Sequence, residues 1–322
     1  MVLVIGHNGA WQKTYTLGQI HLGRVNRIGQ SYQSAAGKGA NTCRVLAGYG
    51  IDHQLHGYVG GANGDKYIRG CQDDGIQTRL TPIQGETRIC STFLEADQRM
   101  TEFVEPSPEV QVQEAQDAWD CFMDSLGSAT FLAICGTAAT GEDEDCYLRL
   151  IQAAQALGIP AILDSYKDHG KRALLAGPEI IKINLEELSE MSGYPVHTQE
   201  ERITAYGKMI REWNLKWIII TMGEKGAEAC NGTSVISCQA PAVDVVNPIG
   251  SGDSVTAGII TAILRGSDGK KIDFSDEQLM KSALILGVAS GTANVMNWKP
   301  GHIEDRDLEE IMKGLTVQVR AL

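Results

Sequence analysis

Short apolar runs that alternate with amphipathic segments constrain the fold of this chain more than any other feature of its sequence. Helical patterns occupy residues 146–158 and 200–213. Five runs are rich in β-branched residues and bounded by Gly, Pro, Asn or Asp, as expected of buried strands: residues 2–6, 130–136, 160–165, 179–184 and 217–221. Alternating strands and helices form right-handed βαβ units. We therefore predict a parallel sheet covered by helices on both faces.

Two segments depart from this alternation. Residues 11–35 and 86–104 alternate polar and apolar positions, which is typical of exposed antiparallel strands set apart from the main sheet. We predict that both are insertions that form one small β lid on a single domain comprising residues 1–322. A pair of ordinary edge hairpins is the alternative that the pattern leaves open.

Composition limits the classes of function. The net charge of −12 argues against nucleic-acid binding and membrane-surface binding, because both require a basic face. No apolar run reaches the roughly 18 residues of a membrane span, and the N-terminus lacks a signal-peptide pattern. The eight cysteines include no CxxC pair, which indicates buried thiols in a reducing compartment. We therefore expect a cytoplasmic protein.

The strongest chemical signal is NPIGSGDSVTAGIITAIL, residues 247–264. A proline and two glycines mark a turn, and a helix follows. Four residues stand where that helix begins: Gly250, Ser251, Gly252 and Asp253. Amides at a helix start bind anions, and a carboxylate beside them suits deprotonation of a hydroxyl. A helix-capping role for Asp253 is the alternative.

AAGKGAN, residues 35–41, is interpreted as a glycine turn that enters a helix. Gly39 occupies the place where a Walker loop requires Ser or Thr, so the motif does not support a P-loop. Lys38, among glycines at a helix start, suits contact with a sugar or a phosphate. A solvated loop lysine is the alternative.

Together these motifs resemble those of the phosphofructokinase B (ribokinase-like) carbohydrate kinases, over almost the whole chain. Residues 36–41 resemble the family's GGKGxN-type loop, and residues 247–255 resemble its DTxGAGDxF-type turn. KINLEEL (182–188) and TMGEKGA (221–227) resemble two further family segments. The sequence is most similar to the 1-phosphofructokinase and tagatose-6-phosphate kinase branch.

The resemblance implies a three-layer α/β/α ribokinase-like fold with a mainly parallel central sheet and a small β lid. It implies an enzyme that uses ATP and magnesium to phosphorylate a hydroxyl of a sugar or sugar phosphate, above all a hexose phosphate. Asp253 would be the catalytic base, and the amides of residues 250–252 would form the anion hole.

The resemblance also assigns binding residues. The substrate side would comprise Gln12, Gly37, Lys38, Asn41 and Arg88. The nucleotide side would comprise Lys182, Asn184, Thr221, Gly223, Gly226, Ser290 and Asn294, the last two near the adenine. Asn184 and Glu187 would position magnesium through water, because magnesium gives up its water ligands reluctantly.

One departure from the branch affects substrate choice. Gln12 stands where the branch has an Asp that holds sugar hydroxyls. Because an amide donates as well as accepts, we expect a different sugar preference. If Gln12 lies on the lid rim and contacts nothing, the substitution has no such effect.

Two other functions remain open at this point. A nucleoside kinase of the same family would use stacking aromatic residues in the lid, for which Trp11 and Tyr15 are candidates. A non-catalytic sugar- or nucleotide-binding regulator on the same fold would be marked by loss of Asp253 or of the glycine turn, and both are present. We further expect a homodimer formed through the lid.

Overall fold

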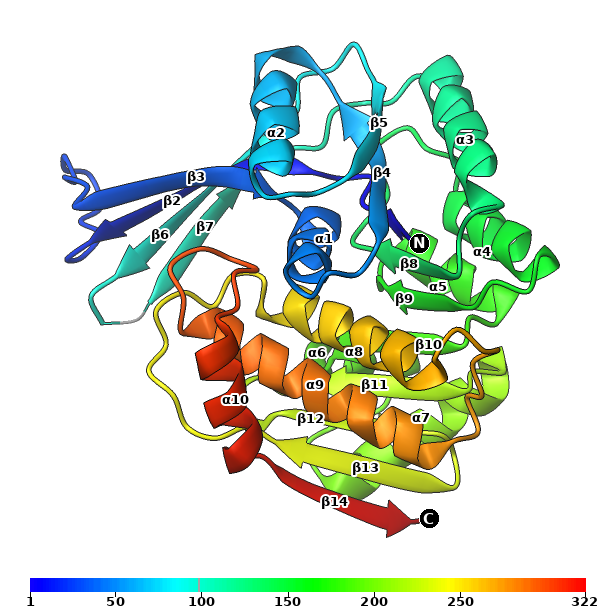
Figure 1. The fold of residues 1–322 in the computed structure, drawn as a ribbon. Helices are drawn as coiled ribbons and strands as arrows, with labels where there is room; N and C mark the ends of the chain where they lie inside the picture. Colours follow the sequence, from blue (N-terminus) through cyan, green and yellow to red (C-terminus); the bar gives the residue numbers. More distant parts are fainter. Residues whose placement is uncertain (98) are drawn as a thin grey trace.

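The computed structural model describes residues 1–97 and 99–322, so Gln98 of the second predicted lid segment lies outside the described residues. A ten-stranded sheet lies between two layers of helices, and a separate four-stranded sheet projects from one side (Figure 1). Within the described residues, no helix combines the length and the apolarity that crossing a membrane requires.

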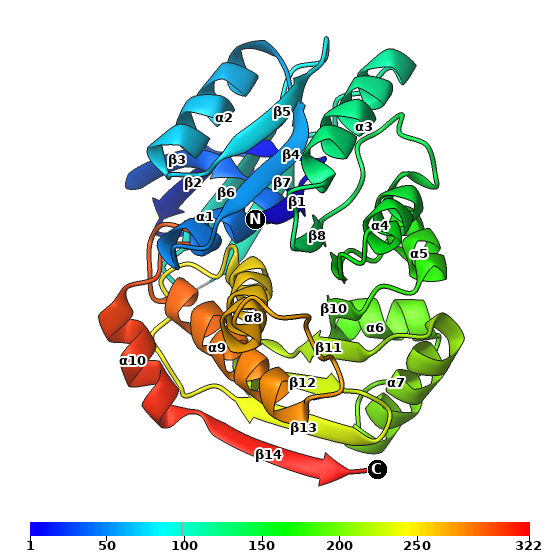
Figure 2. The same cartoon turned by 45° about the vertical axis from the view of Figure 1, so that its right-hand side comes forward.

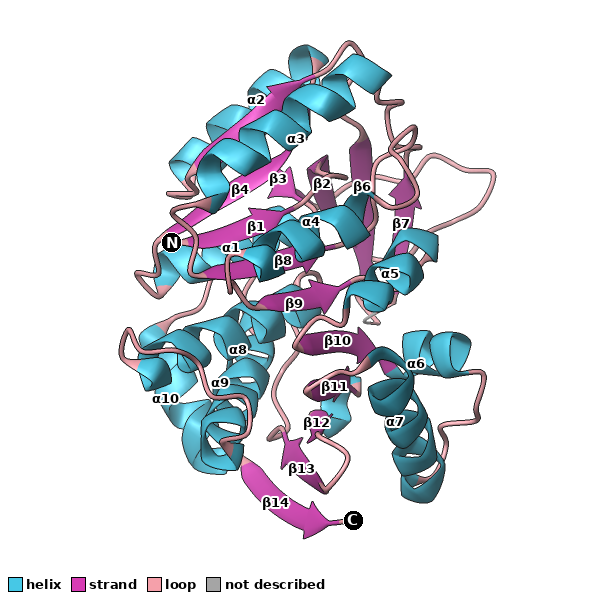
Figure 3. Cartoon of the chain, turned by 90° about the vertical axis from the view of Figure 1, so that its right-hand side faces the viewer, coloured by secondary structure: helices cyan, strands magenta, loops and turns pink. Residues whose placement is uncertain are grey.

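The central sheet is mainly parallel. Its parallel strands lie side by side in the order β5 (Thr78–Pro82), β4 (His53–Val59), β1 (Val2–Ile5), β8 (Phe131–Cys135), β9 (Ala161–Asp164), β10 (Ile180–Asn184) and β11 (Trp217–Thr221). Antiparallel strands extend it beyond β11: β12 (Ala227–Cys230), β13 (Ser234–Gln239) and β14 (Thr316–Ala321). Figure 3 shows this succession, with the C-terminus on the outermost strand. The predicted strands are confirmed, all within the parallel part.

Helices cover both faces of the sheet (Figure 2). One layer comprises α1 (Lys38–Gly48), α2 (Gly61–Asp73), α8 (Ser251–Ser267) and α9 (Glu277–Val295), with α10 (Asp305–Gly314) against α9. The other comprises α3 (Val112–Leu126), α4 (Cys146–Ala156), α5 (Asp168–Ala173), α6 (Leu185–Ser192) and α7 (Gln199–Trp213). The predicted three-layer α/β/α architecture is confirmed.

The core explains why β1 is apolar at every position. Val2 and Val4 of β1 belong to the cluster beneath α1, α8 and α9, whereas Leu3 and Ile5 belong to the cluster beneath α3 and α4. All four side chains are fully buried. A parallel strand covered on both faces therefore shows a continuous apolar run instead of alternation.

The small sheet is the predicted lid. Its strands lie in the order β3 (Gln30–Ala36), β2 (Ala10–Leu17), β6 (Ile89–Glu95) and β7 (Met100–Val104). Because this sheet is separate from the main one, the edge-hairpin alternative is wrong. The antiparallel expectation holds only within each hairpin, since β2 and β6 pair in parallel. β2 follows β1, and β6 follows β5. Because β1 and β5 run in the same direction, β2 and β6 also enter the lid in the same direction and pair in parallel.

Candidate active site

A turn at residues 247–250 positions the start of α8 beside the ends of β9 and β10. Gly250 is the N-cap and has a φ of 78°, a left-handed conformation that favours glycine. The Asn247 side chain stabilises the turn by accepting a hydrogen bond from the Ile249 amide at 3.1 Å. The first turn of α8 therefore presents amides that intrahelical bonding does not use, together with the positive end of the helix dipole.

Asp253 lies in this first turn and is only 7% exposed. Its Oδ2 accepts a hydrogen bond from Asn41 Nδ2 at 2.8 Å. Gly250, not Asp253, is the N-cap of α8, and within the described residues the Asp253 carboxylate accepts a hydrogen bond only from Asn41, so the capping alternative is wrong. Burial raises the pKa of Asp253, and repulsion from Asp164 adds to this against the opposing charges of Lys38 and Lys182. A raised pKa makes the carboxylate a stronger proton acceptor than an ordinary aspartate.

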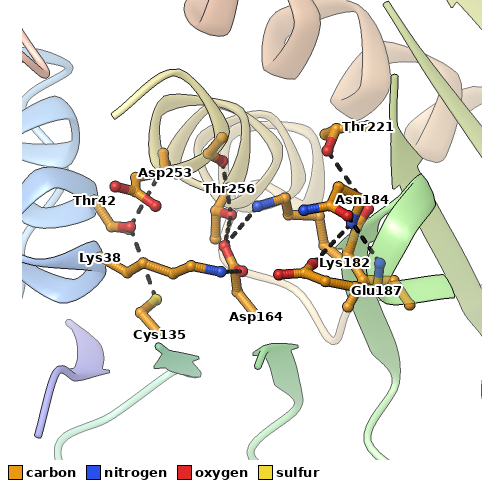
Figure 4. A network of polar contacts seen from close by, with 12 residues as sticks. Lys38, Thr42, Cys135, Asp164, Lys182, Asn184, Glu187, Thr221, Asp253 and Thr256 are labelled. Carbon is orange, nitrogen blue, oxygen red and sulfur yellow. Dashed lines mark hydrogen bonds and ion pairs between the residues drawn. The ribbon is translucent and has the colours of Figure 1, made fainter. Parts of the chain in front are cut away.

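A second buried carboxylate, Asp164 at the end of β9, organises the floor of the site (Figure 4). Lys38 Nζ donates to its Oδ1 at 2.7 Å. Lys182 Nζ and Thr256 Oγ1 both donate to its Oδ2 at 2.7 Å. Burial opposes ionisation of Asp164, yet the two ammonium groups hold the pKa of this carboxyl well below its usual range.

The pairing leaves a local excess of positive charge. Two lysines share one carboxylate, so the trio carries a net charge of about +1. Although burial opposes it, the charges of Asp164, Glu187 and Asp253 raise the pKa of Lys38, so this lysine stays protonated. A Cβ on Gly252 would lie 3.3 Å from Lys182 Nζ, which places that ammonium against the start of α8. An otherwise acidic protein thus concentrates cations where α8 offers free amides.

Asp164 is a site residue that was not predicted from the sequence, where it was assigned only to a strand. The available signal was an aspartate at the carboxyl end of a buried parallel strand, where α/β proteins place their binding groups. Lys38, in contrast, is no solvated loop lysine, because it is held in the Asp164 ion pair.

A cleft of about 350 Å³ opens between the lid and the starts of α1 and α8. Of the floor residues, Lys38 lines this cleft. Its lining includes the predicted substrate-side residues together with several others: Asn8, Gln12, Gly37, Lys38, Asn41, Arg88, Glu102, Thr137, Gly250 and Asp253. Residues from the lid, from α1 and from α8 therefore meet around one space. Trp11 and Tyr15 are not among the lining residues: Trp11 Nε1 donates to Gln33, and Tyr15 stacks on Phe93.

Gln12 lies inside the cleft. Its side chain is 3% exposed, and its Nε2 donates to Thr92 Oγ1 at 2.8 Å. The alternative that placed Gln12 on the lid rim without contacts is therefore wrong. Arg88 enters the same cleft from the second lid segment, where its Nη2 donates to the Asn8 carbonyl oxygen at 3.0 Å.

The predicted nucleotide-side residues continue along the same edge of the sheet. Asn184 is the N-cap of α6, where its side chain and that of Glu187 form a capping box. Figure 4 shows this pair and Thr221 beside Lys182. Gly226 has a φ of 84°, and a Cβ there would lie 2.0 Å from the Cys238 carbonyl oxygen, so this turn requires glycine. Gly223, also at positive φ, begins the same turn (η2, Gly223–Lys225).

Ser290 and Asn294 require a correction. Both are fully buried in α9. Ser290 Oγ contacts Tyr49 and donates to the Leu286 carbonyl oxygen, while Asn294 Nδ2 donates to the Ile249 carbonyl oxygen at 2.8 Å. These side chains are directed toward protein groups rather than toward an adenine. The small residues of α9 instead permit close packing on α8, since a Cβ on Gly291 would lie 2.7 Å from Val255 Cγ2.

The donor set fits a weakly held hard cation. No group of three or more His, Cys, Asp or Glu side chains within the described ranges could hold a metal ion by itself. One Glu187 oxygen accepts the Asn184 amide, and both Asp164 oxygens accept from lysines. Such an arrangement suits Mg²⁺, which keeps several waters and binds through one or two carboxylates plus substrate phosphates.

Comparison with known proteins identifies the family. Residues 1–294 match the pfkB family carbohydrate kinases. A tagatose-6-phosphate kinase of Staphylococcus epidermidis is 31% identical over 319 residues, which cover 98% of this chain and 99% of the relative.

Solved structures show the same fold at lower identity. Phosphofructokinase-2 from Escherichia coli in complex with substrates and products superposes with a TM-score of 0.84 at 20% identity, covering 97% of this chain and 98% of the other. A possible 1-phosphofructokinase from Thermotoga maritima superposes with a TM-score of 0.85 at 17% identity, covering 99% of each chain. With residues 1–294 matched and the relative aligned almost end to end, the chain belongs to the pfkB family of carbohydrate kinases, phosphotransferases with an alcohol group as acceptor.

Proposed function

We propose that this protein phosphorylates a hydroxyl of a hexose phosphate with ATP, and that Asp253 is the catalytic base. The observation that supports this most directly is the position of Asp253: a buried carboxylate of raised pKa in the cleft, at the start of α8 and beside a net positive lysine pair. The 31% identical relative is a tagatose-6-phosphate kinase, which favours a hexose phosphate as substrate.

The proposed reaction uses charge and position more than covalent chemistry. The Asp253 carboxylate accepts the proton of the attacking sugar hydroxyl. At the same time the hydroxyl oxygen bonds to the γ-phosphorus, and the bond between the γ-phosphorus and the ADP oxygen breaks. The first-turn amides of α8 and the cations Lys38 and Lys182 stabilise the charge on the transferring group. Closure of the lid would exclude water that otherwise hydrolyses ATP.

Magnesium belongs to the same proposal. Asn184 and Glu187 would hold it through water, and it would neutralise phosphate oxygens when bound. The ion pair of Lys38 with Asp164 at 2.7 Å supports a role for this lysine beside the transferring phosphoryl group. Of the two cations predicted on the substrate side, Lys38 and Arg88, it is Arg88 that would then recognise a phosphate already on the sugar.

Arg88 is suited to bind the phosphate that the substrate already carries. A guanidinium has five N–H donors, and one Nη2 contact goes to the Asn8 carbonyl oxygen. Arg88 Nε has no hydrogen-bond partner among the described residues. Arginine matches phosphate geometry through paired N–H donors.

Gln12 would accept a sugar hydroxyl. Its Nε2 approaches the Lys13 carbonyl oxygen at 3.4 Å and Thr92 Oγ1 at 2.8 Å. A carbonyl oxygen only accepts, and the Thr92 hydroxyl donates toward Glu102 at 3.4 Å, so both neighbours favour this amide orientation. The Gln12 oxygen is then left for the substrate as a neutral acceptor in place of the carboxylate of the resembled branch.

Two finer expectations complete the proposal. The lid strand β7 exposes Phe103 and Val104, which supports a homodimer formed through the lid, and sedimentation of Phe103→Asp would test it. All eight cysteines are free thiols, which supports a cytoplasmic location.

The test is substrate-dependent ADP release from a panel of hexose phosphates, free hexoses and nucleosides, with and without magnesium. We expect the highest kcat/KM with a hexose phosphate. Highest activity with a nucleoside would favour the nucleoside-kinase alternative. ADP release with none of the panel, despite ATP binding, would favour the non-catalytic regulator.

A further inference from the structure

A series of buried hydrogen bonds connects Asp74 to Asp253 through Arg44 and Asn41 of α1. Asp74 Oδ2 accepts from Arg44 Nε at 2.8 Å. Arg44 Nη1 donates to Asn41 Oδ1 at 2.9 Å, and Asn41 Nδ2 donates to Asp253 Oδ2 at 2.8 Å. The Arg44 side chain is 3% exposed, and it lies outside the cleft lining, so it contacts no substrate directly.

This series of hydrogen bonds fixes the orientation of the Asn41 amide. An asparagine side chain can turn by a half-rotation, which exchanges its oxygen and its NH₂ group. Arginine only donates, so the Asn41 oxygen faces Arg44 and the NH₂ group faces Asp253. In the reversed orientation the amide oxygen would face the Asp253 carboxylate, and the NH₂ group would face the Arg44 donors.

Arg44 is itself held by groups from several elements. Besides Asp74, which follows α2, it donates to the Pro300 carbonyl oxygen at 3.1 Å and to that of Ala35 in lid strand β3. Pro300 also packs against Gly250, since a Cβ on Gly250 would lie 3.3 Å from Pro300 Cβ. The guanidinium thus has one rigid position relative to both the lid and the start of α8.

We propose that Arg44 is a positioning residue for the phosphoryl-transfer reaction: by holding the Asn41 amide in one orientation, it aims a hydrogen-bond donor at the catalytic carboxylate. The inference depends on the proposed role of Asp253 as the base. Asp164, Lys38 and Lys182 are the charged groups that face Asp253 from β9, α1 and β10, and Arg44 acts behind Asn41. Asn41 stabilises the ionised carboxylate, so disorder of its amide raises the pKa of Asp253.

The test is a double-mutant cycle with Arg44→Met and Asn41→Ala. Two quantities are measured in each variant: the acid limb of kcat against pH, and the titration of the Asp253 carboxyl carbon by ¹³C NMR. We expect Arg44→Met to lower kcat about tenfold or more, as for loss of a hydrogen bond to a charged group, and to move both titrations to higher pH. In the Asn41→Ala background, Arg44→Met should produce no further shift.

Arg79→Met is the matched control, because Arg79 also pairs with an aspartate, Asp124, but at the surface. It should leave kcat and the acid limb unchanged. Arg44→Lys keeps the charge and loses the planar fork, so it should shift both titrations in the same direction by less. If Arg44→Met does not fold, Arg44→Lys supplies the cycle.

Two results would overturn the proposal: unchanged titrations in the Arg44 variants, or the same shift whether or not Asn41 is present. A lower melting temperature with unchanged titrations would mean that Arg44 has a structural role only. The NMR titration does not require turnover. A failure of Asp253 as the base, seen as normal kcat in Asp253→Asn, is therefore distinguishable from a failure of this inference.

Discussion

The floor of the cleft and its lid side satisfy their polar groups in opposite ways. On the floor, both Asp164 oxygens accept short hydrogen bonds, and Lys38 and Lys182 are ion-paired at 2.7 Å. On the lid side, within residues 1–97 and 99–322, Arg88 Nε has no hydrogen-bond partner and Gln12 uses only its NH₂ group. The floor is thus organised before any ligand binds, whereas the lid side keeps hydrogen-bonding capacity for one. We infer that the floor performs the common chemistry and that the lid side selects the sugar.

The largest expected effect concerns the base. Asp253→Asn should lower kcat by about 100- to 10,000-fold, the usual contribution of a general base. The melting temperature and the affinity for ATP should stay close to those of the native protein, because the substituted side chain has nearly the same shape. Steady-state kinetics and calorimetry measure both. Near-normal kcat in the folded variant would remove Asp253 from the proposed mechanism.

The floor should also be the more costly region to break in terms of stability. Asp164→Asn leaves two buried ammonium groups without their counter-charge, so we expect a loss of about 3–5 kcal/mol in the free energy of unfolding. Urea unfolding of Asp164→Asn beside Asp124→Asn, a change in a surface ion pair, measures the difference. Equal stability of the two variants would contradict the idea of a prebuilt floor.

On the lid side, Arg88→Ala should change substrate recognition more than stability. Loss of a charge-assisted contact of about 1.5–3 kcal/mol should raise KM for a hexose phosphate tenfold or more, with a smaller change for the unphosphorylated parent sugar. Arg99→Ala, an exposed lid arginine paired with Asp97, is the matched control and should leave both KM values unchanged. Equal weakening of both substrates in Arg88→Ala would argue against phosphate recognition by Arg88.

The pH dependence of kcat tests whether the floor changes the pKa of Asp253. Burial and Asp164 raise the pKa of Asp253, and only the ionised carboxylate accepts the substrate proton. As the pH falls through this raised pKa, kcat should fall, at a higher pH than for an ordinary aspartate. A pH–rate profile with a saturating hexose phosphate measures the acid limb. A limb at the ordinary pKa of an aspartate would mean that burial does not tune this group.

The smallest expected effect is at Gln12. Gln12→Asp introduces the carboxylate of the resembled branch and should shift the ratio of kcat/KM values toward fructose and tagatose phosphates by about tenfold, because a charged acceptor forms stronger hydrogen bonds. Gln33→Asp, a change at an exposed lid position, should leave the ratio unaltered. An identical ratio in Gln12→Asp would mean that the Gln12 oxygen contacts no sugar hydroxyl.

Local signals predicted much of the fold and part of the site. The β-branched runs, the helix of residues 146–158 and the glycine turn before Asp253 were predictable because each depends on periodicity or turn chemistry within a few residues. The burial of Ser290 and Asn294 was not predictable, because a small polar residue on a helix suits either a ligand surface or a tight helix contact. The packing of α9 on α8 resolves that ambiguity.

By itself, the sequence determined the alternating α/β architecture, the lid insertions and the placement of Asp253 at a helix start. The tertiary structure decided which groups meet there. Lys38 and Asp164 are 126 residues apart, and Asn41 and Asp253 are 212 residues apart. No local pattern encodes such pairs, because they depend on the order of strands in the sheet and on the packing of α1 against α8. The fold brings the ends of β9 and β10 and the starts of α1 and α8 to one edge of the sheet. These four separate segments thereby form one charged site.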